Sequence, residues 1–343
     1  MILLLVLSSA LLHSVWNVMV RATPDRDATI FNVALVSLVV AWLYFFAFEG
    51  MGPAVTTVGM LACVGAGFFE VFAFVALAKA YHAGPVGPAY AIARGAAPLM
   101  LLPFSMLWMG EAPHTGAVVA MLITAGGVLL LGRRKTSPVD PNAKSPAHTS
   151  GFTPAVAPLP RGSVPKFTAL HQPRPVVYYA AAFIAAACIA TFNGCYKICS
   201  LQHLGPAARY CVSLSLTLPF QLLFLRKHPP GSQEADLGLP AHATMPFRRI
   251  AEAFKKYPWQ SIGGGTICAA SFLLYLVALD LGGQAGPDGR TVGVSALTSL
   301  RTLSIPVAAL IALTFLKEKL GARDWLGIAV ITGGIVMLSI FSA

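Results

Sequence analysis

The chain has 343 residues, of which 56% are hydrophobic and only 11% are charged, whereas about a quarter of an ordinary soluble domain is charged. With a mean hydropathy of +0.71, this composition excludes a water-soluble globular protein. The net charge of +11 comes largely from two polar connections. Basic residues in such connections set the orientation of a membrane protein in the bilayer, and we do not attribute them to nucleic-acid binding. We therefore expect no nucleic-acid partner.

Ten apolar runs are long enough to cross a bilayer, which requires roughly 20 mostly apolar residues per helix. The first run lacks the basic start of a secretory signal and is interpreted as an uncleaved span. The predicted spans are residues 2–20, 29–48, 55–79, 86–108, 115–132, 176–199, 207–225, 258–279, 292–316 and 322–341. The predicted fold class is an all-α, multi-pass integral membrane protein.

Two long polar connections interrupt the spans. Residues 133–175 open with three cations and are rich in Pro, Ser and Thr, a composition that predicts a disordered linker. The second connection, residues 226–257, ends in PFRRIAEAFKKYPW, where Phe247, Ile250 and Phe254 share one helical face between basic residues. This pattern predicts an amphipathic helix on an anionic lipid surface, and a solvated basic loop is the alternative.

The second half of the sequence repeats landmarks of the first half. The shared order is an aromatic-Asn pair, an arginine inside a span, a glutamate 17 residues later and a glycine pair 15 residues after that. The landmarks are Trp16-Asn17, Arg94, Glu111 and Gly126-Gly127, then Phe192-Asn193, Arg301, Glu318 and Gly333-Gly334. Because each half has an odd number of spans, residues 1–132 and 176–343 are predicted to form two inverted five-helix repeats.

Charged side chains inside spans are functional candidates because each costs about 2.5–3.5 kcal/mol at mid-helix on insertion scales. Arg94 and Arg301 lie too far inside their spans to reach the headgroups. They either line a central cavity and bind an anionic group, or they have structural roles, with Arg94 paired to Glu70. The candidate contacts beside them are Trp16, Asn17, Tyr90 and Asn193, with His13 on the same helical stripe as Asn17.

Three glutamates are candidates for other roles. Glu70, in GAGFFEVFAF, is a candidate coupling site that takes up and releases a proton, and a fixed ion pair across helices is the alternative. Glu111 and Glu318 lie at the mouths of predicted spans. They are candidate gating residues, and surface caps are the alternative.

Motifs for ATP-driven transport or enzymatic catalysis are absent from the sequence: G-x-x-x-x-G-K-[ST], H-E-x-x-H and G-x-S-x-G do not occur. The six cysteines all fall inside apolar runs without metal-ligand spacing. We expect a protein that is not an enzyme and has no cofactor or metal.

Three segments carry a resemblance to a known family: SALLHSVWNVMVRA, ALAKAYHAGPVGPAYAIARGAAPLM and SLRTLSIPVAALIALTFLKEKLGARDWLGIAVITGGIVML. They resemble the EamA-like branch of the drug/metabolite transporter superfamily. The resemblance implies ten helices in two inverted repeats that export or exchange small metabolites by alternating access. The positions that match recurrent family residues are Glu70, Tyr90, Arg94, Gly95, Pro98, Glu111, Arg301, Ser304 and Glu318.

Together these patterns predict a secondary-active exporter or exchanger of small organic metabolites, anionic because buried cations outnumber anions. One alternative is a proton-coupled exporter of cationic or lipophilic drugs that uses Glu70 to bind its substrate. Another is a membrane scaffold or lipid-modifying enzyme without transport. The expected partners are a small-molecule solute, the lipid bilayer and protons, and the protein is expected to be a monomer or homodimer.

Overall fold

The structure is a computed structural model that describes residues 1–21, 23, 25–50, 56–83, 86–111, 114–132, 175–227, 246–283, 292–315 and 321–342. Every regular element in these ranges is helical. The predicted linker, apart from its last residue, lies outside the described residues.

The first half of the chain forms five long helices. They are α1 (Ile2–Arg21), α2 (Arg26–Tyr44), α3 (Thr57–Ala83), α4 (Val86–Met109) and α5 (Thr115–Gly132). A short π-helix, η1 (Phe45–Glu49), continues α2.

The second half forms seven described helices. They are α6 (Pro175–Leu201), α7 (Pro206–Lys227), α9 (Pro246–Lys256), α10 (Pro258–Gly282), α11 (Val294–Arg301), α12 (Ser304–Phe315) and α13 (Ala322–Ser342). The first four of these helices begin with proline, which fits the first helical turn because its missing N–H would have no intrahelical partner there.

Six helical segments are long and apolar enough to cross a membrane. They are Ile2–Val20, Asp27–Glu49, Thr57–Leu77, Ile92–Met109, Val176–Leu201 and Pro258–Gly282, with shorter apolar helices at Thr115–Leu130 and Trp325–Phe341. Large apolar side chains cover the outside of these helices: Leu107 and Trp108 are 83% and 75% exposed. An extended apolar exterior is typical of a membrane-contacting surface, so the chain is an all-α protein of membrane type.

The predicted ninth span, residues 292–316, is broken into α11 and α12. Pro306 has no N–H to donate to the carbonyl of Thr302, and Ile305 N donates to that oxygen instead, at 2.9 Å. The break leaves Arg301 as the last residue of α11. Discontinuous helices are common at the solute sites of secondary transporters.

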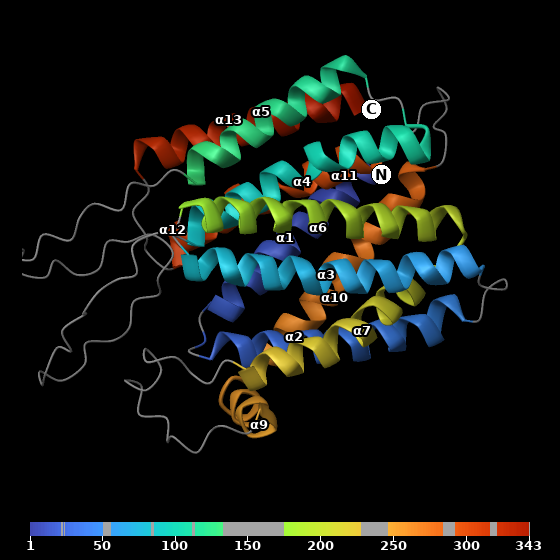
Figure 1. Cartoon of the computed structure of the whole chain (residues 1–343), viewed down its shortest axis with the longest axis vertical. Coiled ribbons are helices and arrows are strands. Elements are labelled where there is room, and N and C mark those ends of the chain that lie inside the picture. Colours follow the sequence, from blue (N-terminus) through green and yellow to red (C-terminus); the bar gives the residue numbers. More distant parts are fainter. Residues whose placement is uncertain are drawn as a thin grey trace, which may run out of the picture.

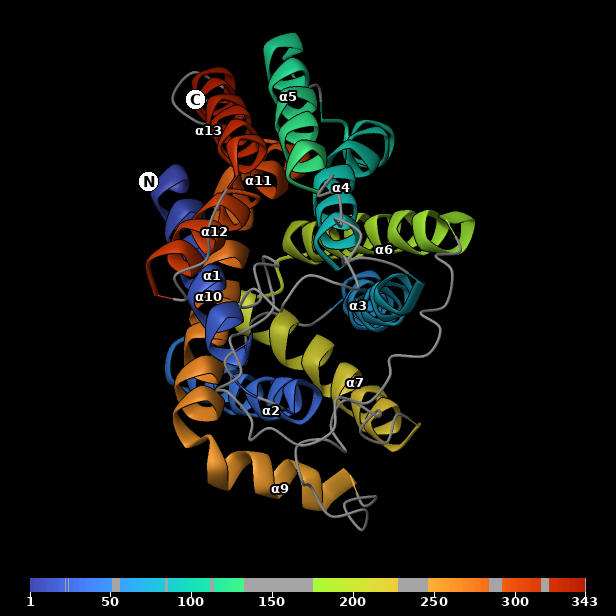
Figure 2. The ribbon, with the colours of Figure 1, turned by 90° about the vertical axis from the view of Figure 1, so that its left-hand side faces the viewer.

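The helices pack as a bundle in which elements of the two halves interleave (Figures 1 and 2). α3 packs on α6, and α1 packs on α10. α7 packs on α3, and α2 packs on α10. α4 packs on α6, whereas α11 and α12 pack on α1. α5 packs on α13, and both chain termini lie at the same end of the bundle (Figure 1).

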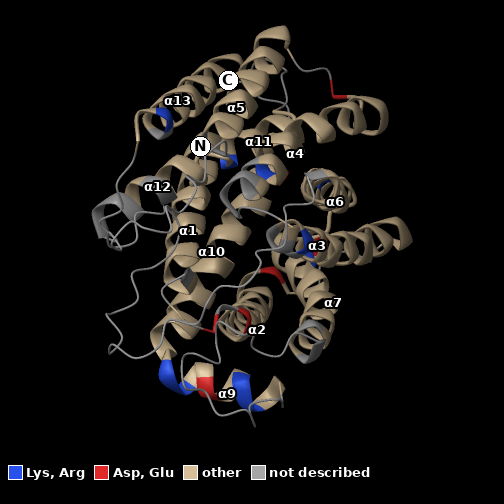
Figure 3. Cartoon of the chain, turned by 60° about the vertical axis from the view of Figure 1, so that its left-hand side comes forward, with Lys and Arg blue, Asp and Glu red and all other residues tan. Residues whose placement is uncertain are grey.

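The amphipathic segment predicted within residues 226–257 contains α9. Figure 1 shows α9 end-on while the long helices run across the view, so it lies across their direction, and Figure 3 shows its basic residues. Arg249 fixes the helix to the bundle, because its Nη2 lies 3.0 Å from Asp25 Oδ1. Asn32 Nδ2 of α2 also donates to the carbonyl of Ile250 at 3.0 Å.

An ion pair between a buried arginine and a partly exposed aspartate connects three helices at the opposite end of the bundle. Arg209 Nη2 of α7 lies 2.7 and 2.6 Å from the two carboxylate oxygens of Asp280 in α10. Arg209 Nη1 donates to the carbonyl of Tyr196 in α6 at 3.1 Å. Nearby, the buried Lys197 donates to Leu279 O at 3.1 Å.

Candidate solute-binding site

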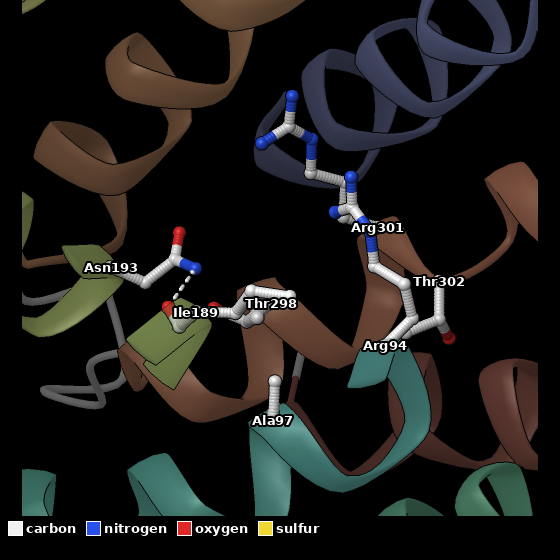
Figure 4. Close-up of a pocket in the computed structure, with 7 residues that line it drawn as sticks. All are labelled: Arg94, Ala97, Ile189, Asn193, Thr298, Arg301 and Thr302. Carbon is white, nitrogen blue, oxygen red and sulfur yellow. Dashed lines mark hydrogen bonds between the residues drawn. The ribbon is translucent and has the colours of Figure 1, made fainter. Parts of the chain in front are cut away.

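A small polar hollow lies between the two halves of the chain. Its lining residues come from α4, from α6 and from α11 with the turn after it. They are Arg94, Ala97, Ile189, Asn193, Thr298, Arg301 and Thr302, drawn in Figure 4. The open space within it is narrow, of the order of a single water molecule. A solute of metabolite size therefore requires a wider conformation.

Arg94 and Arg301, which the sequence places in corresponding spans, meet in this hollow. Figure 4 shows both guanidinium groups extending toward the same side, Arg94 from α4 and Arg301 from α11. Arg301 is only 4% exposed. Its guanidinium carbon lies 4.4 Å from the ring centre of Phe272 and 4.5 Å from that of Tyr275. These are cation–π distances.

No Asp or Glu side chain among the described residues lies within ion-pair distance of Arg301. Its buried Nε also has no hydrogen-bond partner there. A buried guanidinium without an acid is costly, and a buried donor without an acceptor adds to that cost. An anionic group entering the hollow would lower both costs.

His13 of α1 connects the two arginines. Its Nε2 lies 2.9 Å from Arg94 Nη2, and its Nδ1 lies 3.5 Å from Arg301 Nη2. Trp16 Nε1 also points at His13 Nδ1, at 3.2 Å. The four-residue spacing from Asn17 is the only signal in the sequence that singles out His13, and spacing alone does not indicate that it contacts both arginines.

The two candidate asparagines adopt the same local geometry. Asn17 Nδ2 donates to the carbonyl of His13, and Asn193 Nδ2 donates to that of Ile189, each at 2.7 Å and four residues back. Asn193 Oδ1 also accepts from the Tyr275 hydroxyl at 2.9 Å. Asn193 lines the hollow, whereas Asn17 lies one turn after His13 on α1 and is not among the lining residues.

Glu70, the candidate coupling residue, is buried in α3 outside the lining of the hollow. The hydroxyl of Ser213 in α7 donates to its Oε2 at 3.1 Å. Its carboxyl therefore lies between a helix of the first half and a helix of the second. The buried hydroxyl of Tyr196 has no hydrogen-bond partner among the described residues.

Glu111, a candidate gating residue, caps the start of α11. Both of its carboxylate oxygens lie 3.0 Å from the backbone N–H of Val294. A carboxylate at a helix N-terminus satisfies a free N–H and interacts favourably with the helix dipole.

Glu318 and the side chain of Tyr90 lie outside the described residues. The described residues also contain no group of three or more His, Cys, Asp or Glu that could hold a metal ion.

Comparisons with known proteins give a fold and a partial relative. No protein-family model matches the chain. A relative from Sinorhizobium sp., named "Uncharacterized transporter in cobO 3'region", is 36% identical over 77 residues, which are 22% of this chain and 48% of the relative. The match thus spans about half of that relative's length.

A solved crystal structure, described only as that of a protein, has the same fold. It superposes with a TM-score of 0.62 at 16% sequence identity, covering 99% of this chain and 97% of the other. The long apolar helices indicate an integral membrane protein.

Proposed function

We propose that this protein is a secondary-active transporter of small organic anions that works by alternating access, with the two inverted five-helix repeats of an EamA-like carrier. One observation carries the proposal: Arg94 and Arg301, at equivalent positions of the two halves, converge on a single hollow. Paired guanidinium groups are well suited to bind carboxylate or phosphate.

The pattern of helix contacts supports the inverted repeat. If α1, α2, α3, α4 and α5 correspond to α6, α7, α10, α11–α12 and α13, the most extensive contacts between the halves occur in corresponding pairs. The packing of α1 on α10 corresponds to that of α6 on α3, and the packing of α2 on α10 to that of α7 on α3. In the pairs α2–α7 and α5–α13, each helix packs on its own equivalent in the other half. Such contacts are expected where a pseudo-two-fold axis relates the two halves.

Close approaches at glycines support the same correspondence. A Cβ added to Gly67 of α3 would lie 2.9 Å from the carbonyl oxygen of Ser213 in α7. One added to Gly265 of α10 would lie 2.9 Å from the carbonyl oxygen of Val33 in α2. Small residues permit helices to approach this closely in membranes, and here both halves use them at corresponding contacts.

The α5–α13 contact is reciprocal residue by residue. A Cβ on Gly127 would lie 2.8 Å from the backbone nitrogen of Ile331, and one on Gly334 would lie 2.9 Å from that of Thr124. Gly334 follows Gly127 by 207 residues, and Ile331 follows Thr124 by the same 207. Arg94 and Arg301 are separated by the same 207 residues. The sequence repeat that relates α5 to α13 therefore also relates the two arginines.

The narrow hollow fits alternating access. A carrier must pass through conformations in which its central site is closed to both sides, and such a site holds little free space. The break between α11 and α12 places Arg301 beside a point where the helix can bend. We infer that the hollow widens as the two halves move relative to each other.

The arginine assignment is tested by transport in proteoliposomes. A thermal-shift screen against amino acids, organic acids and phosphorylated metabolites identifies a stabilising solute, and exchange of its radiolabelled form is then measured. We expect R94Q and R301Q to reduce exchange by at least about tenfold, the value of one lost hydrogen bond to a charged group. R248Q, on the exposed face of α9, is the matched control and should leave exchange unchanged. Full exchange by both R94Q and R301Q would refute the assignment.

Glu70 supports a second candidate, a proton-coupled exporter of cationic or lipophilic drugs, because it is a buried acid at a contact between the halves. E70Q separates the two candidates. An anion carrier should keep solute exchange in E70Q and lose the dependence of transport on a pH gradient. A cation exporter should lose transport altogether, because the substrate-binding carboxylate is gone.

A further inference from the structure

The imidazole of His13 is surrounded by hydrogen-bond donors. Arg94 Nη2 approaches Nε2 at 2.9 Å. Trp16 Nε1 and Arg301 Nη2 approach Nδ1 at 3.2 and 3.5 Å. Guanidinium and indole N–H groups donate and never accept. His13 is itself buried.

A single imidazole cannot satisfy donors at both ring nitrogens. In its neutral form one nitrogen carries a proton and only the other can accept, and the protonated form accepts at neither. In every protonation state at least one ring nitrogen therefore offers no lone pair to the donor beside it. A group with acceptors on both sides would satisfy Arg94 and Arg301 together.

We propose that, in the solute-free carrier, the His13 imidazole occupies the position at which the oxyanion of the solute binds. A carboxylate or phosphate then displaces this ring and bridges Arg94 and Arg301. We call this the stand-in role of His13. This inference rests on the proposed function and names the chemical group that the site selects. The two nitrogens of an imidazole are separated by about as much as two oxygens of a carboxylate or phosphate. Unlike the ring, each of those oxygens carries lone pairs, so the oxyanion accepts from both arginines.

The rest of the hollow indicates what the remainder of the solute looks like. Beyond the arginines, the described lining residues carry no charge: they are Ala97, Ile189, Asn193, Thr298 and Thr302. Asn193 Oδ1 and the Thr298 hydroxyl are already bonded to Tyr275. A solute with one acidic group and an uncharged, partly apolar body therefore matches this lining better than one with charges at both ends.

The two halves of the chain differ at the position of His13. His13 lies four residues before Asn17, and Ile189 lies four residues before Asn193, with the same asparagine-to-carbonyl bond in each half. The counterpart of His13 is thus an apolar residue that lines the same hollow. At this position the second half of the chain therefore has no side chain that can accept a hydrogen bond from an arginine.

The test compares oxyanion binding by wild type, H13F and H13Q, each as the full chain in detergent. Sodium phosphate and sodium acetate are titrated calorimetrically at constant ionic strength. Phenylalanine keeps a ring but removes the competing acceptor, so H13F should bind at least one of the two probes about tenfold tighter than wild type. H13Q keeps one acceptor and should bind within about threefold of wild type. H114F, at the exposed end of α5, is the matched control and should bind like wild type.

Equal or weaker binding by H13F than by wild type overturns the stand-in role, since weaker binding means that His13 contacts the solute directly. Absence of binding of both probes to wild type and to H13F also overturns it. If H13F does not fold, the ¹⁵N resonances of the His13 ring, assigned by their loss in H13Q, replace it. Phosphate or acetate should shift them in wild type, and unchanged resonances overturn the proposal. Loss of exchange in R94Q and R301Q without tighter binding by H13F leaves the proposed function intact and removes only the role of His13.

Discussion

Replacing Asp280 with alanine tests whether the buried ion pair at the end of the bundle holds α7 against α10. The Arg209 side chain is 0% exposed, whereas that of Asp280 is 30% exposed. In D280A the guanidinium loses both bonds to the carboxylate, at 2.7 and 2.6 Å. It keeps backbone carbonyls as acceptors, including that of Tyr196. The variant therefore leaves a buried cation without a counter-charge.

Removing one partner of a buried ion pair costs about 3–5 kcal/mol. Because Asp280 is partly exposed, water can enter the site in the variant and reduce this cost. We expect the lower end of the range, a loss of about 3 kcal/mol in the free energy of unfolding, which is about a hundredfold in the folding equilibrium.

The free energy is measured by unfolding in mixed micelles of a mild detergent and sodium dodecyl sulfate, monitored by tryptophan fluorescence. The double variant R209M/D280A provides the internal control. Apolar replacement of a whole buried pair is often neutral, so the double variant should recover to within about 1 kcal/mol of wild type. A loss below about 0.5 kcal/mol in D280A, or a double variant less stable than D280A, would refute the reasoning.

Three further predictions concern helix contacts. G127A should cost about 1–3 kcal/mol because its Cβ meets the backbone of α13, whereas G126A, whose Cβ meets nothing within 4 Å, should stay within about 0.5 kcal/mol in the same unfolding assay. E111A should lower stability by about 0.5–2 kcal/mol through loss of the cap on α11, and an unchanged midpoint would contradict that role. R249A should speed hydrogen exchange in α9, since its buried pair with the bundle is lost. R248A, which removes an exposed pair within α9, should change exchange little.

The sequence by itself determined the membrane class and the helical segments. Backbone N–H and C=O groups in lipid must be satisfied within the segment, so a long apolar run can only form a helix there. The helices accordingly begin and end within a few residues of the predicted spans. The exception is the ninth, where Pro306 removes one backbone donor and the helix divides after Arg301.

The tertiary structure decided which polar side chains meet. Spacing placed His13 and Asn17 on one stripe of α1, yet nothing local indicates that this stripe faces Arg94 of α4 and Arg301 of α11. Arg209 was overlooked because it lies near the start of a predicted span, where a cation ordinarily reaches the headgroups. Its burial against Asp280 depends on how α7 and α10 pack. Periodicity along one chain segment fixes which residues share a helix face, whereas the partner of that face is set by the packing of helices distant in sequence.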